Sequence, residues 1–319
     1  MDKKAHLAGL SFATIFGFSF MFSKSALAYV SPIGLVAYRF LLAFLGFELL
    51  RIVKLIRIRI QKGHVRALLL VAFFQPLLYF LFETFGLALT SSGEAGMMVA
   101  LIPIFVVVFG AVFLKEKPRP IQVLFIVLSV SGIIFIQAAG ETQVRSTGSL
   151  GFILLLLAVA SAALFNIASR KASHTSPPHE VTYFMMLVGA VSFNAIYLVQ
   201  LLVEGRLSDY TSSLGHMELL IPLVYLGLIA SIAGFFLVNF TLGRLPAHVS
   251  SIYANLSTIV AIAAGAIFLH EELKLFHFLG STMILIGVYG TVWFGRHPFA
   301  SKVHGLPACG NNQHKKTGA

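Results

Sequence analysis

Charged residues are scarce in this sequence, and their scarcity excludes a soluble protein. Asp, Glu, Lys and Arg make up 11% of the 319 residues, whereas a soluble chain carries about a quarter. Hydrophobic residues make up 58%, and apolar runs of roughly 20 residues, long enough to cross a bilayer, recur along the chain. We therefore expect an all-α integral membrane protein that crosses the cell membrane many times.

Cysteine is nearly absent as well. The single cysteine, Cys309, lies in a polar C-terminal stretch. One cysteine excludes a disulfide framework or a cysteine metal site within one chain. His270 and His277 flank a loop and lack the spacing of metal ligands on a helix face. We expect no metal site and no cofactor.

Enzyme signatures are also lacking. The chain holds no Walker loop, no Gly-x-Ser-x-Gly elbow and no His-Glu-x-x-His helix. The His-Glu-Glu sequence at 270–272 lacks the second histidine of a zinc site. We therefore expect neither an enzyme nor an ATP-driven pump.

The N-terminus resembles a cleavable signal peptide, but we interpret it as a membrane helix. Two lysines precede an apolar run, and the Ala-Leu-Ala sequence at 26–28 is typical of a cleavage site. The apolar run over 7–28 is too long for a signal peptide, and the segment that follows is echoed in mid-chain, where no signal could act.

Turn residues divide the apolar sequence into ten predicted membrane helices. Proline, glycine and serine mark the connections, as at Ser31-Pro32 and Leu245-Pro246. The predicted helices are residues 7–29, 32–52, 66–89, 93–114, 119–138, 149–169, 179–202, 217–242, 246–269 and 273–294.

The chain also repeats itself. The sequence GAVFLKEK at 110–117 returns as GAIFLHEE at 265–272, each inside a pair of apolar runs. The start of each half is echoed too, because Ser23-Lys24 matches Ser169-Arg170 and Pro32 matches Pro178. Repeats on this scale determine the architecture.

The repeats predict the domain boundaries. The first five-helix repeat spans 7–138 and the second spans 149–294, joined by a polar linker at 139–148. Residues 1–6 form a cytoplasmic N-terminus. Residues 295–319 have no apolar period, and we expect them to form a disordered cytoplasmic tail.

Lysine and arginine orient the predicted helices. The net charge is +11, but the basic residues fall in short loops between apolar runs, which is the positive-inside pattern rather than a nucleic-acid surface. Of the 23 Lys and Arg residues, only Lys24, Arg145, Arg206 and Lys274 fall on the side opposite the N-terminus, and Arg39 lies within a helix. Both termini are therefore predicted to be cytoplasmic.

Five helices per half is an odd number, so the second half enters the membrane from the opposite side to the first. Inverted repeats of this kind are typical of secondary transporters, which bind substrate near the midplane and alternate access by rocking one repeat against the other.

At this point a family resemblance is visible. The blocks at 113–117 and 268–272, each followed by a glycine-containing helix, resemble the two EamA domains of the drug/metabolite transporter superfamily. The Leu-Ala-Leu-Thr-Ser-Ser sequence at 87–92 and Ile102-Pro103 resemble the family's helix 3–4 region. The resemblance covers about residues 7–294, and Thr258 departs from it by standing where Pro103 stands in the first half.

The resemblance implies a carrier for amino acids, other metabolites or toxic small molecules. It also implies a central cavity lined largely by helices 3, 4, 8 and 9. Because Thr258 replaces the proline, helix 9 is expected to lack the bend that Pro103 gives helix 4.

Gln75, Tyr79 and Glu83 follow one another at i+4 spacing on predicted helix 3. Polar side chains are costly in hydrocarbon and need a partner or a wet cavity. We interpret the stripe as the lining of a pathway because a carboxylate joins it, and the alternative is that Gln75 and Tyr79 tie neighbouring helices together. Pro76 within the stripe removes a backbone donor and could bend the helix.

Arg39 on helix 2 and Glu83 on helix 3 are predicted at equal depth, roughly 10 Å below the outer surface at about 1.5 Å per residue. We predict that they pair, since pairing relieves the cost of both charges. The pair is either a structural bridge or a functional one in which Glu83 carries a coupling proton.

Further residues, for which the sequence gives weaker support, complete the predicted pathway. An asparagine in mid-helix ties helices together as often as it contacts a ligand. Pro103 frees the carbonyl of Val99, which could face a cavity. Glu116 and Glu271 are interpreted as loop residues rather than ligands. The further candidates are Pro103, Asn166, Asn194, Asn239, Tyr253 and Asn255.

These observations predict a secondary transporter of small organic metabolites, such as amino acids or drug-like compounds, that works by alternating access. Export rather than import is implied by the family resemblance alone. The expected partners are a small-molecule substrate, the lipid bilayer and a coupling proton, with no nucleic acid. The alternative is a non-transport membrane protein that handles a lipid or acts as a signalling or interaction partner.

Overall fold

The computed structural model describes residues 2–89, 101–139, 149–212, 215, 217–268 and 274–294. All regular secondary structure within these ranges is helical, and no strand occurs in them. The predicted linker, from residue 140 on, and the predicted tail at 295–319 lie outside the described residues.

The first half of the chain supplies helices close to the predicted positions. Polar or proline residues start them, as expected: the Asp2 carboxylate accepts from the backbone N–H of Lys4 at 3.1 Å, and Ser31 caps a helix whose first residue is Pro32. The elements are α1 (Lys3–Ala26), α2 (Pro32–Ile52), η1 (Lys62–His64), α3 (Val65–Ala72), η2 (Phe73–Leu78), α4 (Tyr79–Leu89), α6 (Ile102–Phe109), η3 (Gly110–Leu114) and α7 (Pro120–Ala139).

The second half follows the same order. Its second helix begins at Pro178, as the second helix of the first half begins at Pro32, so the matched prolines occupy matched places. The elements are α8 (Ser149–Ala172), α9 (Pro178–Val203), α10 (Asp209–Ser212), α11 (Met217–Val224), η5 (Tyr225–Gly234), α12 (Phe235–Leu242), α13 (Ala247–Phe268) and α14 (Leu275–Phe294).

Seven helical segments of the described chain are long and apolar enough to cross a membrane. They are Lys3–Ser23, Pro32–Ile52, Lys62–Glu83, Ile153–Ala172, Pro178–Val203, Met217–Leu242 and Leu275–Phe294. Two shorter apolar helices, Ile102–Leu114 and Pro120–Gly132, accompany them. The predicted all-α membrane protein is therefore confirmed as a multi-pass protein.

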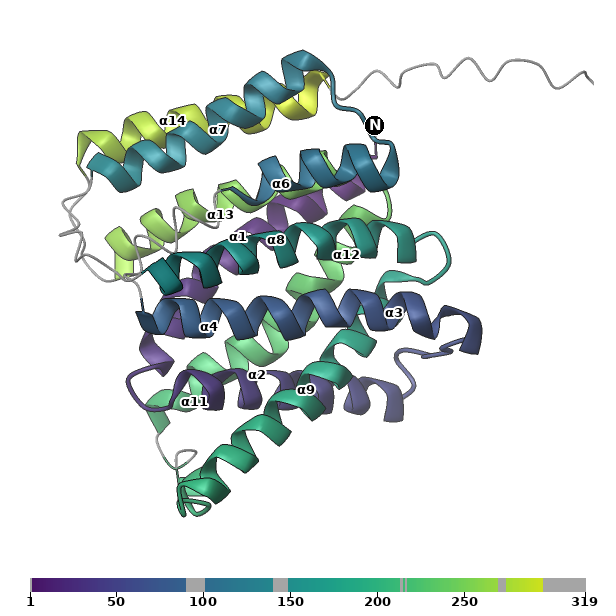
Figure 1. Ribbon diagram of the computed structural model, residues 1–319, viewed down its shortest axis with the longest axis vertical. Coiled ribbons are helices and arrows are strands. Elements are labelled where there is room, and N and C mark those ends of the chain that lie inside the picture. The colour runs from purple at the N-terminus through teal and green to yellow at the C-terminus, as the bar shows by residue number, and fades with distance from the viewer. Residues whose placement is uncertain are drawn as a thin grey trace, which may run out of the picture.

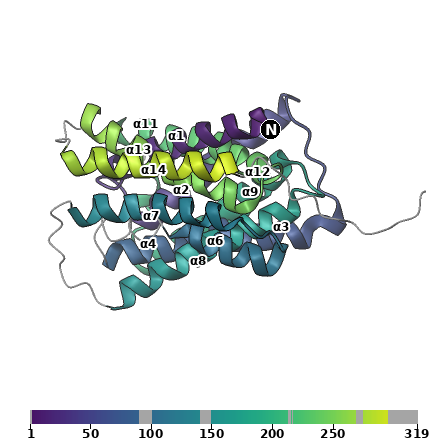
Figure 2. The same ribbon diagram turned by 90° about the horizontal axis from the view of Figure 1, so that it is seen from above.

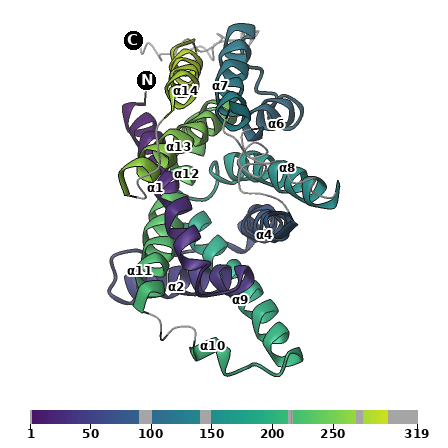
Figure 3. The same ribbon diagram turned by 90° about the vertical axis from the view of Figure 1, so that its left-hand side faces the viewer.

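The first helix of each half packs against helices of the other half. Helix α1 packs on α13, η5 and α12 of the second half, and α8 packs on α4 and α6 of the first half. The second helices, α2 and α9, pack on each other, and so do the fifth, α7 and α14. Figure 1 shows the α7–α14 pair at one end, and Figure 2 shows two layers, with α1, α13 and α14 in one and α4, α6, α7 and α8 in the other. Figure 3 separates the same two groups of helices.

Glycines allow α7 and α14 to approach closely. A Cβ atom on Gly287 would lie 2.5 Å from the Ser129 Cβ, and one on Gly132 would lie 2.7 Å from the backbone oxygen of Gly280. Small residues at helix crossings are typical of membrane proteins, because packing rather than a hydrophobic driving force holds the helices together.

The third helix of the first half is broken, contrary to the expectation of one helix over 66–89. Gln75 has an extended backbone (φ −149°, ψ 118°) inside the wide turn η2. Pro76 follows it, and a residue before proline is disfavoured in the helical region, while proline itself donates no backbone hydrogen bond. The predicted i+4 stripe therefore does not begin at Gln75.

The third helix of the second half is interrupted in its middle too. A π-helical segment, η5, separates α11 from α12 inside the expected helix 217–242. Such segments widen the backbone turn and are frequent at functional sites. Helix α13, by contrast, runs unbroken through Thr258 from Ala247 to Phe268, as the absence of a proline predicts.

Candidate substrate site between the two halves

Arg39 lies where the two halves meet. Its side chain on α2 is buried, with 7% of the residue exposed. The Nε atom donates to the Ser231 Oγ of η5 at 2.8 Å. The guanidinium carbon also lies 5.2 Å from the centre of the Phe80 ring of α4, a cation–π distance. One cation thus contacts an element of each half.

The π-helical segment prepares Ser231 to receive Arg39. The Ser231 hydroxyl donates to the Leu226 carbonyl, five residues earlier, at 2.8 Å. Its hydrogen is used in that bond, so its oxygen is left to accept from Arg39. The partner of Arg39 is therefore produced by the local widening of η5.

Tyr79 and Glu83 form a second polar pair on α4. The Tyr79 hydroxyl donates to Glu83 Oε1 at 3.1 Å, one helical turn away. The Tyr79 and Phe80 rings meet edge to face, with centres 5.1 Å apart. Phe80 thus contacts both the cation and the tyrosine that holds the carboxylate.

Arg39 and Glu83 interact electrostatically, as the prediction of a pair requires, but the two side chains make no direct contact. Both residues are described, and no hydrogen bond or ion pair joins them: Arg39 binds Ser231, and Glu83 accepts from Tyr79. The reason lies in the packing. Helix α2 packs mainly on α9 and η5, while α4 packs mainly on α8, and Phe80 rather than Glu83 is the α4 side chain that lies against Arg39.

Arg39 keeps binding capacity in this arrangement. Within the described residues no hydrogen bond reaches its two terminal nitrogens. Glu83 interacts with this charge only through space, and a guanidinium can bind a carboxylate directly through two parallel hydrogen bonds. The geometry therefore suits an anionic group of a ligand.

Gln75 lies apart from this cluster. Its backbone is extended, its side chain is half-buried, and it makes no hydrogen bond to any residue that the structure describes. The neighbouring Pro76 is buried and approaches Gly189 of α9. The structure brings Tyr79 and Glu83 together but leaves Gln75 out.

Two predicted asparagines of the second half tie helices together. Asn194 of α9 donates to the Ala37 carbonyl of α2 at 3.0 Å and accepts from the Tyr210 hydroxyl at 2.7 Å. Asn239 of α12 is fully buried, where it accepts from Ser169 of α8 at 2.6 Å and donates to Thr182 of α9 at 2.9 Å. These contacts match the helix-tying interpretation.

The other predicted residues also have partners outside the Arg39 cluster. Asn166 donates to the Ala162 carbonyl of its own helix, α8, at 2.8 Å. The Tyr253 hydroxyl lies 2.6 Å from His6 Nδ1 of α1, and Asn255 donates to Ser129 of α7 at 3.2 Å. Pro103 is buried in the first described turn of α6, and the Val99 carbonyl that it was expected to free lies outside the described residues.

The sequence interpretation missed a second contact between the halves. Glu116, expected to be a loop residue, accepts from Arg170 Nε of α8 at 3.1 Å and from the backbone N–H of Ala247, the first residue of α13, at 2.8 Å. Arg170 also donates to the Leu242 carbonyl at the end of α12, at 2.9 Å. We call Glu116, Arg170, Leu242 and Ala247 the Glu116 cluster. Glu271, its counterpart in the repeat, lies outside the described residues.

The recurrence of both residues in the repeat was the available signal for this cluster. Arg170 belongs to the Ser-Arg sequence that matches Ser23-Lys24, and Glu116 belongs to the repeated block at 110–117. Ser231 offered no such signal, since its role depends on the π-helical turn. Groups of histidine, cysteine and carboxylate suited to a metal are absent from the described residues.

Comparison with known proteins gives one family. The model of the EamA-like transporter family matches residues 3–138 and again residues 149–293. The uncharacterized transporter YcxC of Bacillus subtilis is 38% identical over 287 residues, which cover 90% of this chain and 92% of that protein. The probable amino-acid metabolite efflux pump of Escherichia coli is 26% identical over 306 residues, covering 95% of this chain and 99% of that protein.

A solved crystal structure has the same fold. It superposes with a TM-score of 0.75 and covers 92% of this chain and 99% of its own. The two sequences are 17% identical, so this likeness shows the fold alone. The names of these relatives indicate transporters rather than enzymes.

Proposed function

Because the chain belongs to the EamA-like transporter family of multi-pass membrane proteins, we propose that it is a secondary transporter that exports small organic metabolites from the cell. Amino acids and drug-like compounds are the substrate class. The name of the Escherichia coli relative, a probable amino-acid metabolite efflux pump, supports both the direction and the class. No nucleotide is required, because the solute gradient or a coupling proton drives the cycle.

The observation that carries this proposal is the buried Arg39 between the halves. Its guanidinium reaches Ser231 and Phe80, while its terminal nitrogens stay unbonded among the described residues. In the proposed mechanism these nitrogens bind the carboxylate of the substrate. Since binding and release then both occur where α2, α4 and η5 meet, the substrate itself bridges the two halves.

Glu83 is the proposed site of the coupling proton. It accepts from Tyr79 on α4, interacts electrostatically with Arg39, and has no cationic partner within hydrogen-bond distance among the described residues. An ionisable carboxylate in a membrane helix marks a proton or ion pathway by default. Protonation would release Tyr79 and remove a charge from the site as the carrier turns over.

Alternating access is the proposed mechanism, with ten membrane helices in two inverted repeats and both termini in the cytoplasm. The packing supports it, because each contact between the halves has an equivalent when the halves are exchanged. The contact of α1 with α13 corresponds to that of α8 with α6, and the α2–α9 and α7–α14 contacts correspond to themselves. Such reciprocity is expected of a pseudo-two-fold axis in the membrane plane. Asn194, Asn239, Tyr253 and Asn255 then hold the helices that frame the site, while Gln75, Pro103 and Asn166 remain proposed pathway residues.

The test is transport by the purified protein in vesicles. Labelled neutral amino acids should move when the wild type is present. Arg39→Gln should raise the concentration for half-maximal transport of a carboxylate substrate, and should affect the corresponding amino-acid amide much less. Equal effects on the acid and the amide would refute the role of Arg39. Vesicles that move no solute, from protein that co-purifies with a stoichiometric lipid or partner, would favour the non-transport alternative.

A further inference from the structure

A cationic segment lies along one end of the helices, between α2 and η1. Its residues alternate: Ile56, Ile58 and Ile60 are half-buried and pack against the core, whereas Arg57 and Arg59 point outward and are exposed. Alternation with period two is the pattern of an extended chain with one buried side. The segment therefore displays its arginines on a fixed backbone.

Helix α9 fixes that backbone. The Arg59 N–H donates to Glu180 Oε1 at 2.9 Å, and His179 Nε2 donates to the Arg57 carbonyl at 3.3 Å. Glu180 is buried beneath the segment, and its carboxylate accepts this hydrogen bond from the backbone rather than pairing with an arginine side chain. Both bonds come from the first turn of α9, so the outward positions of the arginines are set by the fold.

The cations continue onto the next element without acidic partners. Lys62 starts η1 and Arg66 lies in the first turn of α3, and both are exposed. Among the ion pairs of the described chain, none involves Arg57, Arg59, Lys62 or Arg66. Four exposed cations on one edge are therefore available to an anion from outside the chain.

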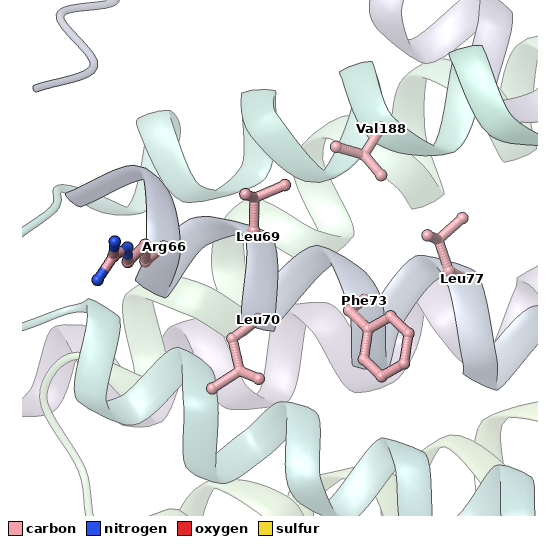
Figure 4. A pocket seen from close by; sticks show the side chains of 6 residues that line it. All are labelled: Arg66, Leu69, Leu70, Phe73, Leu77 and Val188. Carbon is pink, nitrogen blue, oxygen red and sulfur yellow. The ribbon is translucent and has the colours of Figure 1, made fainter. Parts of the chain in front are cut away.

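An apolar groove begins where these cations end. Figure 4 shows Arg66 at one end, Leu69, Leu70, Phe73 and Leu77 along α3 and η2, and Val188 of α9 on the side toward which Leu69 and Leu77 point. The groove has a volume of about 420 Å³. Leu69, Leu70 and Phe73 are about half exposed, at 49%, 49% and 48%.

We propose that this edge binds an anionic phospholipid, with its phosphate among Arg57, Arg59, Lys62 and Arg66 and one acyl chain in the groove. The groove runs along α3, which rises about 9 Å from Arg66 to Ala72 at about 1.5 Å per residue, and on along η2 to Leu77, so it follows much of one leaflet of a roughly 30 Å hydrocarbon core. Basic residues next to a membrane helix attract anionic headgroups. The charge and the length of the site thus both fit one lipid.

The same charges disfavour a second copy of the chain as the occupant. Two-fold contact through this edge would place its cations against the same cations of the partner, and like charges repel. A phospholipid supplies the missing anion and the apolar chain in one molecule. The proposal rests on membrane insertion and is independent of the solute that the protein carries.

Lipid retention in native mass spectrometry tests the proposal. The full-length protein in detergent is mixed with phosphatidylglycerol or with phosphatidylcholine of the same chain length, and only the anionic lipid should stay bound. The double variant Arg57→Gln with Arg66→Gln should weaken retention about thirtyfold, at roughly fivefold per cation. Lys171→Gln, which removes an exposed cation at the end of α8, is the matched control and should retain the lipid.

A second variant separates the acyl groove from the cations. Val188→Trp should weaken retention of phosphatidylglycerol while thermal unfolding in detergent stays that of the wild type. Equal retention of the two lipids, or unchanged retention in the double variant, would overturn the proposal. So would displacement of the lipid by soluble glycerol phosphate, which assigns the cations to a free anion. A dimer that Val188→Trp disrupts would assign the groove to a second copy and overturn it as well.

Discussion

Arg39 holds a charge inside the membrane with a hydroxyl as its partner and an aromatic ring beside it. The Ser231 oxygen accepts from Nε at 2.8 Å, and the Phe80 ring lies 5.2 Å from the guanidinium carbon. Neither group neutralises the charge. The arrangement keeps the arginine in place and leaves its terminal nitrogens without hydrogen bonds among the described residues, as the proposed binding of a carboxylate requires.

Removing the hydroxyl alone should therefore destabilise the protein. In Ser231→Ala the Nε of Arg39 stays buried without an acceptor, and we expect a loss of about 1–2 kcal/mol, seen as a lower thermal midpoint in detergent. Ser250→Ala is the control, because the buried Ser250 hydroxyl has no hydrogen-bond partner among the described residues. A midpoint that falls equally in both variants would mean that the Arg39–Ser231 bond contributes nothing.

At this scale the sequence predicted which residues are polar and buried, but not which of them meet. Depth along the helices placed Arg39 and Glu83 at one level, and depth is all that residue counting supplies. Contact depends on the rotation of each helix, and Phe80 takes the place beside Arg39 that Glu83 was expected to take. Asn239 and Asn194 could likewise be expected to serve as ties, while their partners Thr182 and Tyr210 could not.

The elements pack through glycines where helices of the two halves meet. Helices α7 and α14 hold matched glycines, Gly132 and Gly287, at their crossing. These two residues were already aligned by the sequence repeat. Gly132 admits the Gly280 region of α14 and Gly287 admits the Ser129 region of α7, so both glycines allow the fifth helices of the halves to lie together.

Adding one methyl group should test that crossing. Gly287→Ala places a Cβ 2.5 Å from the Ser129 Cβ and 2.6 Å from the Phe125 backbone oxygen, and overpacking of this kind costs about 1–3 kcal/mol. At Gly110 the nearest atom would be 3.7 Å away, so Gly110→Ala is the matched control. Thermal unfolding of the two variants in detergent should differ, and equal stability would mean that α7 and α14 separate easily.

Irregular turns were the least predictable elements. Pro76 predicted a bend in the third helix, and the structure places the break at the neighbouring residue, Gln75. The π-helical η5 has no comparable mark, because Tyr225–Gly234 contains no proline. Its effect is nevertheless local and chemical, since it positions Ser231 for Arg39.

At the scale of the whole molecule, the central prediction is the orientation of the two halves in the membrane. The distribution of lysine and arginine predicts cytoplasmic termini, with Arg206 outside and Lys62 inside. In a variant with Cys309 replaced by serine, a cysteine at Arg206 should react with an impermeant reagent in intact cells, and a cysteine at Lys62 only after permeabilisation. The reverse pattern would place Arg57, Arg59, Lys62 and Arg66 on the outer side and contradict the inverted-repeat topology.

The Glu116 cluster joins the halves at one end of the molecule. Glu116 belongs to the first half, while its partners Arg170 and Ala247 belong to the second. If the halves rock, contacts at this end break in each cycle, so their strength sets the balance between the two states. An equilibrium shifts by the differential free energy that a contact supplies.

Glu116→Gln should therefore alter transport without unfolding the protein. The substitution keeps an oxygen for the Ala247 N–H but removes the ion pair with Arg170, a half-buried interaction worth roughly 1–3 kcal/mol. We expect the transport rate to change by about five- to a hundredfold, since that range corresponds to these energies, and the thermal midpoint to fall only modestly while the protein stays folded. Glu204→Gln, which removes an exposed pair 3.8 Å from Arg206, should leave the rate alone, because surface pairs contribute little. A lowered midpoint with an unchanged rate would make the cluster a purely structural contact, and the balance between the two transport states would then depend on other contacts.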